Sequence, residues 1–206
     1  MKLQTLTLSF LACTGLAKPV RRDASQAIYA LRLSSSVPSL NGLYLTRSPN
    51  NRTILGIFPH PNDNNENNNN NNNNNKILFY PVHDPKSGLS ELRTPASGDT
   101  LAVLGFNGLL DLASLADPAA VDLAEGTTCD WTSFRLEPDH ERKSGAAETG
   151  TVMYAGEGSE GRWVAFPAAG DPGAGGGWYV KWKDVNAWTM ADYMPVQLEY
   201  QLAEGK

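Results

Sequence analysis

The sequence has 206 residues, with 22 Asp and Glu against 17 Lys and Arg, and a net charge of −5. Nucleic acids and anionic membranes require a basic surface on their partners, so this acidic balance argues against both. A chain of this length can bury a full hydrophobic core without help from disulfides.

The first residues have the pattern of a targeting segment. Met1-Lys2 supplies a positive start, residues 3–16 form an apolar run, and small residues lead to Ala17, after which signal peptidase would cut. The run is too short to span a bilayer as a mature helix. We therefore expect a signal peptide over residues 1–17 and secretion.

A dibasic pair follows the expected cleavage point. Arg21 and Arg22 resemble a processing site for a Kex2-type protease of the fungal secretory pathway, so we expect a pro-segment over 18–22 and a mature chain from Asp23. The alternative is that the pair is only a charged tail. The polar C-terminal residues offer no hydrophobic tail for a lipid anchor, so we expect no membrane anchor.

Removal of residues 1–22 would change both charge and thiol content. It would take away four bases and no acid, leaving 13 bases against 22 acids and a net charge of −9. Cys13 would leave as well, so Cys129 would be a free thiol with no intramolecular partner. A lone cysteine is typically a small buried hydrophobe; an intermolecular disulfide is the alternative.

From Asp23 onward, short apolar runs alternate with turn residues, as is typical of β-strands. Asn41-Gly42 predicts a turn, because both residues tolerate positive φ. Asn51-Arg52-Thr53 is an N-glycosylation sequon within another turn, so we expect a glycan on Asn51; an unmodified turn is the alternative. The strands predicted in this part are 27–33, 43–46, 53–58 and 76–82.

Residues 62–75 are almost all asparagine, interrupted by Asp63 and Glu66. Such a segment cannot bury enough apolar surface to fold, so it predicts a disordered loop. Because the strand pattern resumes at Lys76, the loop is expected to lie within one β domain covering 23–206.

The second half continues the strand pattern. Asn107-Gly108 is a strong hairpin signal, whereas 114–126 predicts a short helical turn near Asp117-Pro118 or an irregular loop. The predicted strands are 89–93, 101–106, 109–112, 131–136, 151–155, 162–166, 178–183 and 194–202. The sequence thus predicts an all-β fold, an antiparallel sandwich or barrel of about a dozen short strands. A β-trefoil is the alternative, although no clear threefold repeat is visible.

The segment 162–188 is rich in aromatic residues. Within it, Trp178, Val180 and Trp182 alternate with Tyr179, Lys181 and Lys183, which predicts a strand with one apolar face. That face is either core or a platform on which a sugar could stack. The candidate ligand-binding residues are Trp163, Trp178, Tyr179, Trp182 and Trp188.

Signatures of catalysis are missing from the sequence. There is no GxSxG motif, and the three histidines (His60, His83 and His140) lack metal-ligand spacing, so we expect no metal and no cofactor. A hydrolase would need two carboxylates facing one cleft. The acids near predicted strand ends are Asp99, Asp111, Asp130, Glu157 and Asp184.

Four segments of the chain resemble a diffuse group of small secreted fungal proteins. The segments are ALRLSSSVP near the start, NGLLDLAS, WTSFRLEP and RWVAFP. The group includes cell-wall proteins of the phialide-associated type and IgE-binding allergens. The resemblance implies an extracellular or wall-associated protein without catalytic activity. The chain differs from that group in having Cys129 alone where those proteins carry several cysteines.

These observations together favour a non-catalytic secreted fungal protein, associated with the cell wall or acting at a host surface. A carbohydrate-binding, lectin-like module that uses the tryptophan-rich face is the alternative, and a hydrolase is a third. The partner would be a cell-wall polysaccharide or a host surface protein.

Overall fold

The computed structural model describes residues 26–58, 75–139, 148–156, 160–168 and 176–203. Within these ranges the chain forms fourteen strands, one short 3₁₀ helix and no α-helix, which confirms the predicted all-β class. The elements are β1 (Tyr29–Ser34), β2 (Thr46–Arg47), β3 (Leu55–Ile57), β4 (Leu78–His83), β5 (Ser90–Arg93), β6 (Thr100–Phe106), β7 (Leu109–Leu115), η2 (Pro118–Ala120), β8 (Thr127–Asp130), β9 (Phe134–Pro138), β10 (Thr149–Tyr154), β11 (Gly161–Pro167), β12 (Trp178–Asp184), β13 (Met194–Pro195) and β14 (Gln197–Leu202).

Six of the strands form a closed barrel. Going around it, β5, β4, β1, β14, β10 and β9 pair antiparallel with their neighbours, and the pairing of Ser90 with Phe134 joins β5 to β9 and closes the ring. A closed barrel leaves no unpaired edge among its strands. β1 and β14 form the longest of these barrel pairings, in register from Tyr29 opposite Leu202 to Ser34 opposite Gln197.

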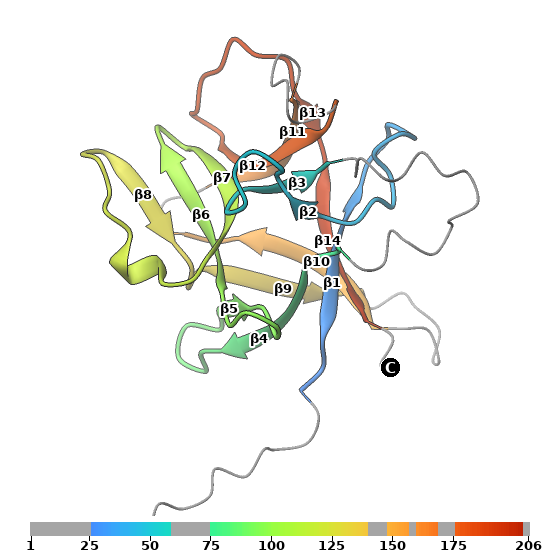
Figure 1. The fold of residues 1–206 in the computed structure, drawn as a ribbon, viewed down its shortest axis with the longest axis vertical. Coiled ribbons are helices and arrows are strands. Elements are labelled where there is room, and N and C mark those ends of the chain that lie inside the picture. Colours follow the sequence, from blue (N-terminus) through green and yellow to red (C-terminus); the bar gives the residue numbers. More distant parts are fainter. Residues whose placement is uncertain (1–25, 59–74, 140–147, 157–159, 169–175, 204–206) are drawn as a thin grey trace, which may run out of the picture.

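Three hairpins pack together at one end of this barrel. They are β2–β3, β6–β7 and β11–β12, which lie in the upper part of Figure 1. β12 pairs with both β3 and β7, and an isolated bridge between Ile54 and Ala113 joins the first hairpin to the second. Strand β12 is therefore the element on which the three hairpins converge.

The order of the strands repeats three times along the chain. Residues 29–83, 90–138 and 149–202 each supply one barrel strand, one hairpin and a second barrel strand. This is the connectivity of a β-trefoil, the alternative in our sequence analysis. The second and third units add a strand after the hairpin, β8 beside β6 and β13 beside β11.

The hydrophobic core fills the barrel and continues under the hairpins. Barrel strands contribute Leu31, Phe79, Leu92, Phe134 and Val152, each at most 1% exposed. The hairpins cover the barrel with further buried side chains, which are Leu55, Leu101, Val103, Leu112, Trp163, Val180 and Trp182. Burial of this kind is the main favourable contribution to folding.

Several local predictions are confirmed. Asn107 and Gly108 both have positive φ (52° and 72°), as a two-residue hairpin turn of this hand requires. Asp117 caps the 3₁₀ helix by accepting a hydrogen bond from the amide of Ala119, with Pro118 in the first turn.

Other boundaries differ from the predictions. Strand β8 was not predicted, and the strand expected to begin at Trp131 begins at Phe134. The strand expected over 43–46 is reduced to β2 and a bridge from Arg32 to Tyr44. The expected signal peptide, pro-segment and asparagine-rich loop, with Ala17, Arg21 and Arg22, lie outside the described residues except for Asn75.

Candidate functional site

Two of the five candidate aromatic residues, Trp163 and Trp182, belong to the core, which is one of the two alternatives that the sequence left open for them. Trp163 and Trp182 lie directly opposite each other on β11 and β12 and are 2% and 1% exposed. Their rings meet edge to face with centroids 5.3 Å apart, a favourable aromatic geometry. Trp163 donates its Nε1–H to the carbonyl of Val152 at 2.6 Å. Neither ring is available to a ligand.

Trp178 and Tyr179 lie at the start of β12 and are half-buried. Trp178 packs against the core beside β3, where it lies opposite Ile57. Tyr179 packs its ring edge to face on Phe58 at 5.2 Å. The alternation predicted for this strand is correct, since Val180 and Trp182 are buried whereas Lys181 and Lys183 are partly exposed.

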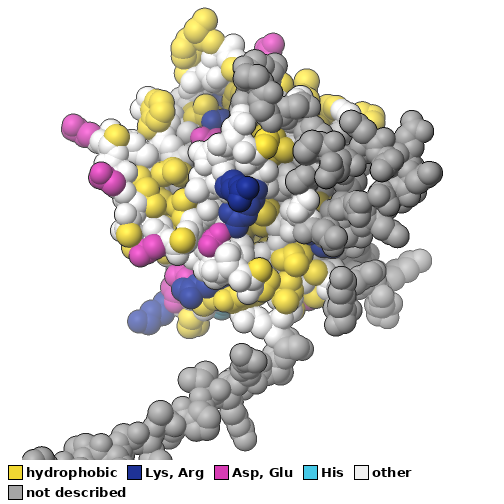
Figure 2. All heavy atoms as spheres, in the orientation of Figure 1, with side chains coloured by type: hydrophobic (Ala, Val, Ile, Leu, Met, Phe, Trp, Pro, Cys, Tyr) yellow, Lys and Arg dark blue, Asp and Glu magenta, His cyan; other side chains and the backbone are white. Residues whose placement is uncertain are grey.

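Trp188 is the one candidate whose side chain is open to solvent. It is 81% exposed and lies in the loop that joins β12 to β13, together with Val185 (61%) and Met190 (86%). The turn of the β6–β7 hairpin lies against this loop and carries Phe106, which is 62% exposed. We call these four side chains the apolar loop surface. In Figure 2, hydrophobic side chains project at the top of the view, and others are spread over the rest of the described surface.

Backbone hydrogen bonds hold this loop close to the hairpin turn. The amide of Asp184 donates to the carbonyl of Gly108 in the hairpin turn at 2.8 Å, and the amide of Val185 donates to the backbone carbonyl of Glu160, just before β11, at 2.7 Å. The Asp184 carboxylate then accepts a hydrogen bond from the amide of Asn186. At the far end of the loop, Tyr193 packs on Phe166 with ring centroids 5.6 Å apart. The exposed side chains are thus carried on a tethered segment.

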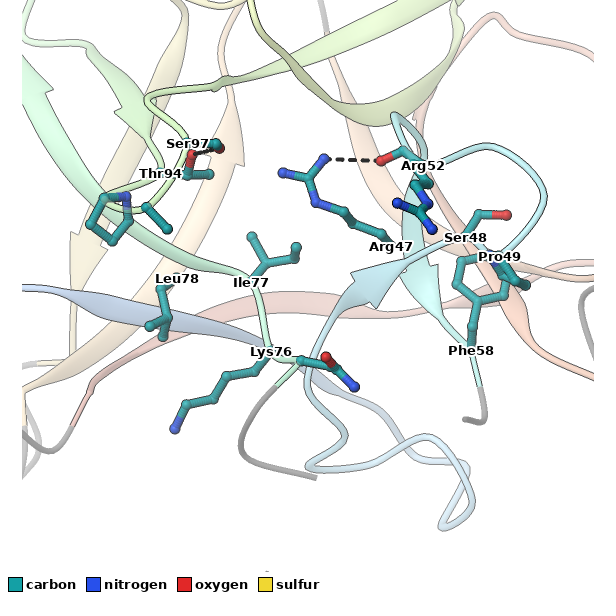
Figure 3. Close-up of a pocket in the computed structure, with 13 residues that line it drawn as sticks. Arg47, Ser48, Pro49, Arg52, Phe58, Lys76, Ile77, Leu78, Thr94 and Ser97 are labelled. Atoms are coloured by element: carbon teal, nitrogen blue, oxygen red, sulfur yellow. Dashed lines mark hydrogen bonds between the residues drawn. The ribbon is translucent and has the colours of Figure 1, made fainter. Parts of the chain in front are cut away.

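A second feature is a pocket of about 640 Å³ beside the first hairpin (Figure 3). Its walls come from the β2–β3 connection, the residues that lead into β4, and the turn between β5 and β6. The described lining residues are Arg47, Ser48, Pro49, Arg52, Phe58, Asn75, Lys76, Ile77, Leu78, Thr94, Pro95, Ala96 and Ser97. None of them carries a carboxylate, and three carry a positive charge. Nothing in the sequence pattern predicted this pocket.

Arg47 at the pocket wall is fixed by its neighbours. Its guanidinium donates to Asp99 Oδ2 at 2.8 Å, to Ser114 Oγ at 3.0 Å and to the carbonyl of Arg52 at 2.9 Å. Burial tends to raise the pKa of Asp99, but hydrogen bonds from Arg47, Ser97 and Ser114 and the charge of Arg47 outweigh it and lower that pKa. The contacts of Arg47 with Asp99 and Ser114 therefore join β2 to the β5–β6 turn and to β7.

The acidic residues considered for hydrolysis have structural partners. Asp111 pairs with Lys181 at 2.7 Å, and Asp130 accepts a hydrogen bond from Tyr154 Oη at 3.0 Å. With Asp99 bound to Arg47 and Asp184 in a turn, the described members of this set serve separate local contacts. Glu157 lies outside the described residues.

The described cysteine and histidine residues, Cys129 and His83, lie on separate strands, β8 and β4. Cys129 is half-buried on β8, and burial together with the charge of Asp130 raises the pKa of its thiol, which disfavours the reactive thiolate. Among the described residues, no group of three His, Cys, Asp or Glu side chains could hold a metal ion. His60 and His140 lie outside those ranges, and His83 ends β4.

The sequon lies in an exposed turn before β3. Asn51 Oδ1 accepts hydrogen bonds from the amide and the hydroxyl of Thr53, at 3.1 and 2.6 Å. The side chain of Asn51 is accessible, so a glycan on it would project into solvent. In the part of the chain that is described, no helix is long and apolar enough to cross a membrane.

Comparisons with protein-family models, with curated proteins and with solved structures found no match to this chain.

Proposed function

We propose that this protein is a non-catalytic secreted fungal protein that binds a protein partner at the cell wall or at a host surface through the apolar loop surface. The observation that carries the proposal is the exposure of Trp188 and Met190, at 81% and 86%. The leader pattern, the acidic composition and the sequon support an extracellular setting.

The composition of the apolar loop surface favours a protein partner. Large exposed apolar clusters mark interaction sites more often than scattered single residues do. Tryptophan is enriched among the residues that dominate binding energy, and methionine adapts to irregular apolar surfaces. Phe106, Val185, Trp188 and Met190 combine these properties on two adjoining segments.

Carbohydrate binding is the second candidate, and one observation favours it. Trp188 lies among polar side chains of the same loop, Asn186, Thr189 and Asp192, that could bond to sugar hydroxyl groups. An exposed indole ring can stack on the apolar face of a sugar. Because Trp163 and Trp182 are buried, such a site would depend on Trp188 alone rather than on an aromatic strand face.

Binding to isolated fungal cell walls tests both candidates. We expect the protein to bind intact walls, to lose binding when the walls are stripped of protein by protease, and to lose at least tenfold in affinity in the variant Trp188→Ala. Leu123→Ala is the matched control, because Leu123 is an exposed apolar residue (38%) outside the apolar loop surface. The same comparison on cultured host cells covers the host-surface alternative.

Three results would change the conclusion. If Trp188→Ala and the wild type bind equally well to walls and to host cells, the apolar loop surface is not the binding site. Retained binding to protease-treated walls, with iodide quenching of tryptophan fluorescence reduced by chitin, glucan or mannan fragments, would establish the carbohydrate candidate. Turnover of such fragments would show that the protein is an enzyme.

A further inference from the structure

The pocket beside the first hairpin differs in chemistry from the rest of the protein. The chain has a net charge of −5, yet the described lining of the pocket has three cations and no carboxylate. Its volume of about 640 Å³ falls in the range of small-molecule sites, which is roughly 300–1,000 Å³. The pocket therefore combines the size of a ligand site with a local positive charge.

The three cations have different roles. The charge of Arg47 is balanced by Asp99, and that contact fixes the wall. Lys76 Nζ lies 5.2 Å from the centre of the Tyr44 ring, and Figure 3 shows its side chain directed away from Arg47. Arg52 is exposed, and its guanidinium has no hydrogen bond or ion pair to any residue that the structure describes. Arg52 thus offers its donors to a ligand.

Arginine is well suited to hold a carboxylate. Its planar guanidinium can donate two parallel hydrogen bonds to the two carboxylate oxygens. Arg47 supports this geometry, because its own donation to the carbonyl of Arg52 positions the backbone from which Arg52 projects. Figure 3 shows Arg47 and Arg52 on the same side of the opening, next to Ser48.

The remaining walls are largely apolar. Phe58 and Ile77 are buried lining residues, 6% and 5% exposed, whereas the lining residues Pro49, Pro95 and Ala96 are exposed. Proline and aromatic side chains present rigid rings against which a ring-sized group can pack. Together these walls suit a ligand with a small apolar body and one carboxylate.

We propose that this pocket binds a small organic carboxylate, with its charged group on Arg52 and its apolar body between Pro49, Phe58 and Pro95. The proposal is independent of the proposed function, because the pocket is built from β2, β3, β4 and the β5–β6 turn, whereas the apolar loop surface lies on β6–β7 and the β12–β13 loop.

Ligand-observed NMR with benzoate, benzamide and benzyl alcohol tests the proposal on the full chain. These probes share a ring and differ in charge. We expect benzoate to bind and the two neutral probes to bind at least tenfold more weakly. A hydrogen-bonded charge pair contributes about 1.5–3 kcal/mol, which corresponds to about 10- to 100-fold in affinity.

Variants then locate the binding. Arg52→Gln should reduce benzoate affinity about 10- to 100-fold, and Arg52→Lys should restore part of it, since Lys keeps the charge without the planar fork. Arg135→Gln is the matched control, because Arg135 is an exposed arginine on β9 outside the pocket lining. Trp188→Ala should leave benzoate binding unchanged, which keeps this result separate from the wall-binding test.

Two outcomes would overturn the proposal. One is the absence of any benzoate signal at about 10 mM, well above the millimolar affinities expected of so small a ligand. The other is an equal loss of benzoate affinity in Arg52→Gln and Arg135→Gln. That result would mean that benzoate is attracted by any surface arginine and not held in the pocket.

Discussion

Strand β12 and the loop that follows it are both rich in apolar residues, but the strand buries its large apolar side chains whereas the loop exposes them. In β12, Val180 and Trp182 are buried beneath the hairpins at 0% and 1% exposure, whereas a few residues later Trp188 and Met190 are more than 80% exposed. Strand pairing on both sides fixes which β12 residues face inward. The loop is not paired as a strand on both sides, and its large apolar side chains Val185, Trp188 and Met190 are exposed.

The largest expected effect comes from removing a side chain on the buried side of this comparison. Trp182→Ala should lower the free energy of unfolding by about 3–5 kcal/mol, because it opens a cavity beside Trp163 and Tyr154. Urea denaturation measures the loss. Trp182→Phe should cost less, because it fills part of the cavity. A Trp182→Ala variant as stable as the wild type would show that β12 is not the centre of the core.

A smaller effect is expected where the hairpin turn contacts the loop. Gly108 has a positive φ of 72°, and a Cβ added there would lie 2.7 Å from Cβ of Asp184. Gly108→Ala should therefore cost about 1–3 kcal/mol from backbone strain and crowding.

Gly42→Ala separates the two contributions, because Gly42 also has positive φ (78°) but has no atom within 4 Å of the added Cβ. Thermal and urea unfolding of both variants would give the difference. If the two substitutions cost the same, the contact between turn and loop does not constrain the loop.

The third prediction concerns Tyr154, which packs edge to face on Trp182 and donates to Asp130. Tyr154→Phe should cost about 1 kcal/mol at pH 7 through the lost hydrogen bond. Burial first, and then the charge of Asp130, raise the pKa of Tyr154 above its usual value near 10. The unfolded chain therefore loses this proton first, and wild-type stability should fall as the pH rises above about 10.

Unfolding titrations at pH 9 and pH 11 check this dependence. Tyr154→Phe should lose less stability over that interval than the wild type does, because one of the titrating groups is gone. Part of the alkaline loss should persist, since burial and Glu148 raise the pKa of Tyr29 to about 12. Identical losses in the two proteins would contradict the assigned role of Tyr154.

The smallest effect on stability is expected on the exposed side of the comparison. Trp188→Ala should change the free energy of unfolding by less than about 0.5 kcal/mol, as surface substitutions usually do. Iodide should quench the tryptophan fluorescence of the wild type much more than that of Trp188→Ala. The reason is that Trp188 is far more exposed than Trp163 and Trp182. A large stability loss would place Trp188 in the framework instead.

The sequence predicted most where the physical signal is local. Alternation identified the inward residues of β12, and Asn107-Gly108 identified a turn because both residues accept positive φ. The pattern of tryptophans alone could not show that Trp182 is buried and Trp188 exposed, because this depends on which strands pair. Strand β8, with the sequence Thr127–Asp130, was missed because it lacks apolar alternation and is half-exposed beside β6.

The threefold repeat and the pocket were invisible for different reasons. Equivalent first strands bury Leu31, Leu92 and Val152, so the three units share apolar character without sharing a motif. The pocket joins Arg47 and Arg52 to residues 75–78 and 94–97, which are distant in sequence and meet only through the barrel. Residues that meet only through non-local strand pairing have no regular spacing along the sequence, so a periodicity analysis cannot find them.

The extra strands also bear on how this scaffold tolerates new sequence. β8 and β13 both occupy the connection between hairpin and closing barrel strand, and the asparagine run 62–75 occupies that same connection in the first unit. The entropic cost of closing a loop grows only slowly with loop length. Each doubling of the length of this connection should therefore lower the free energy of unfolding by only about 0.6 kcal/mol. It is the natural place to graft a peptide for display without disturbing the barrel.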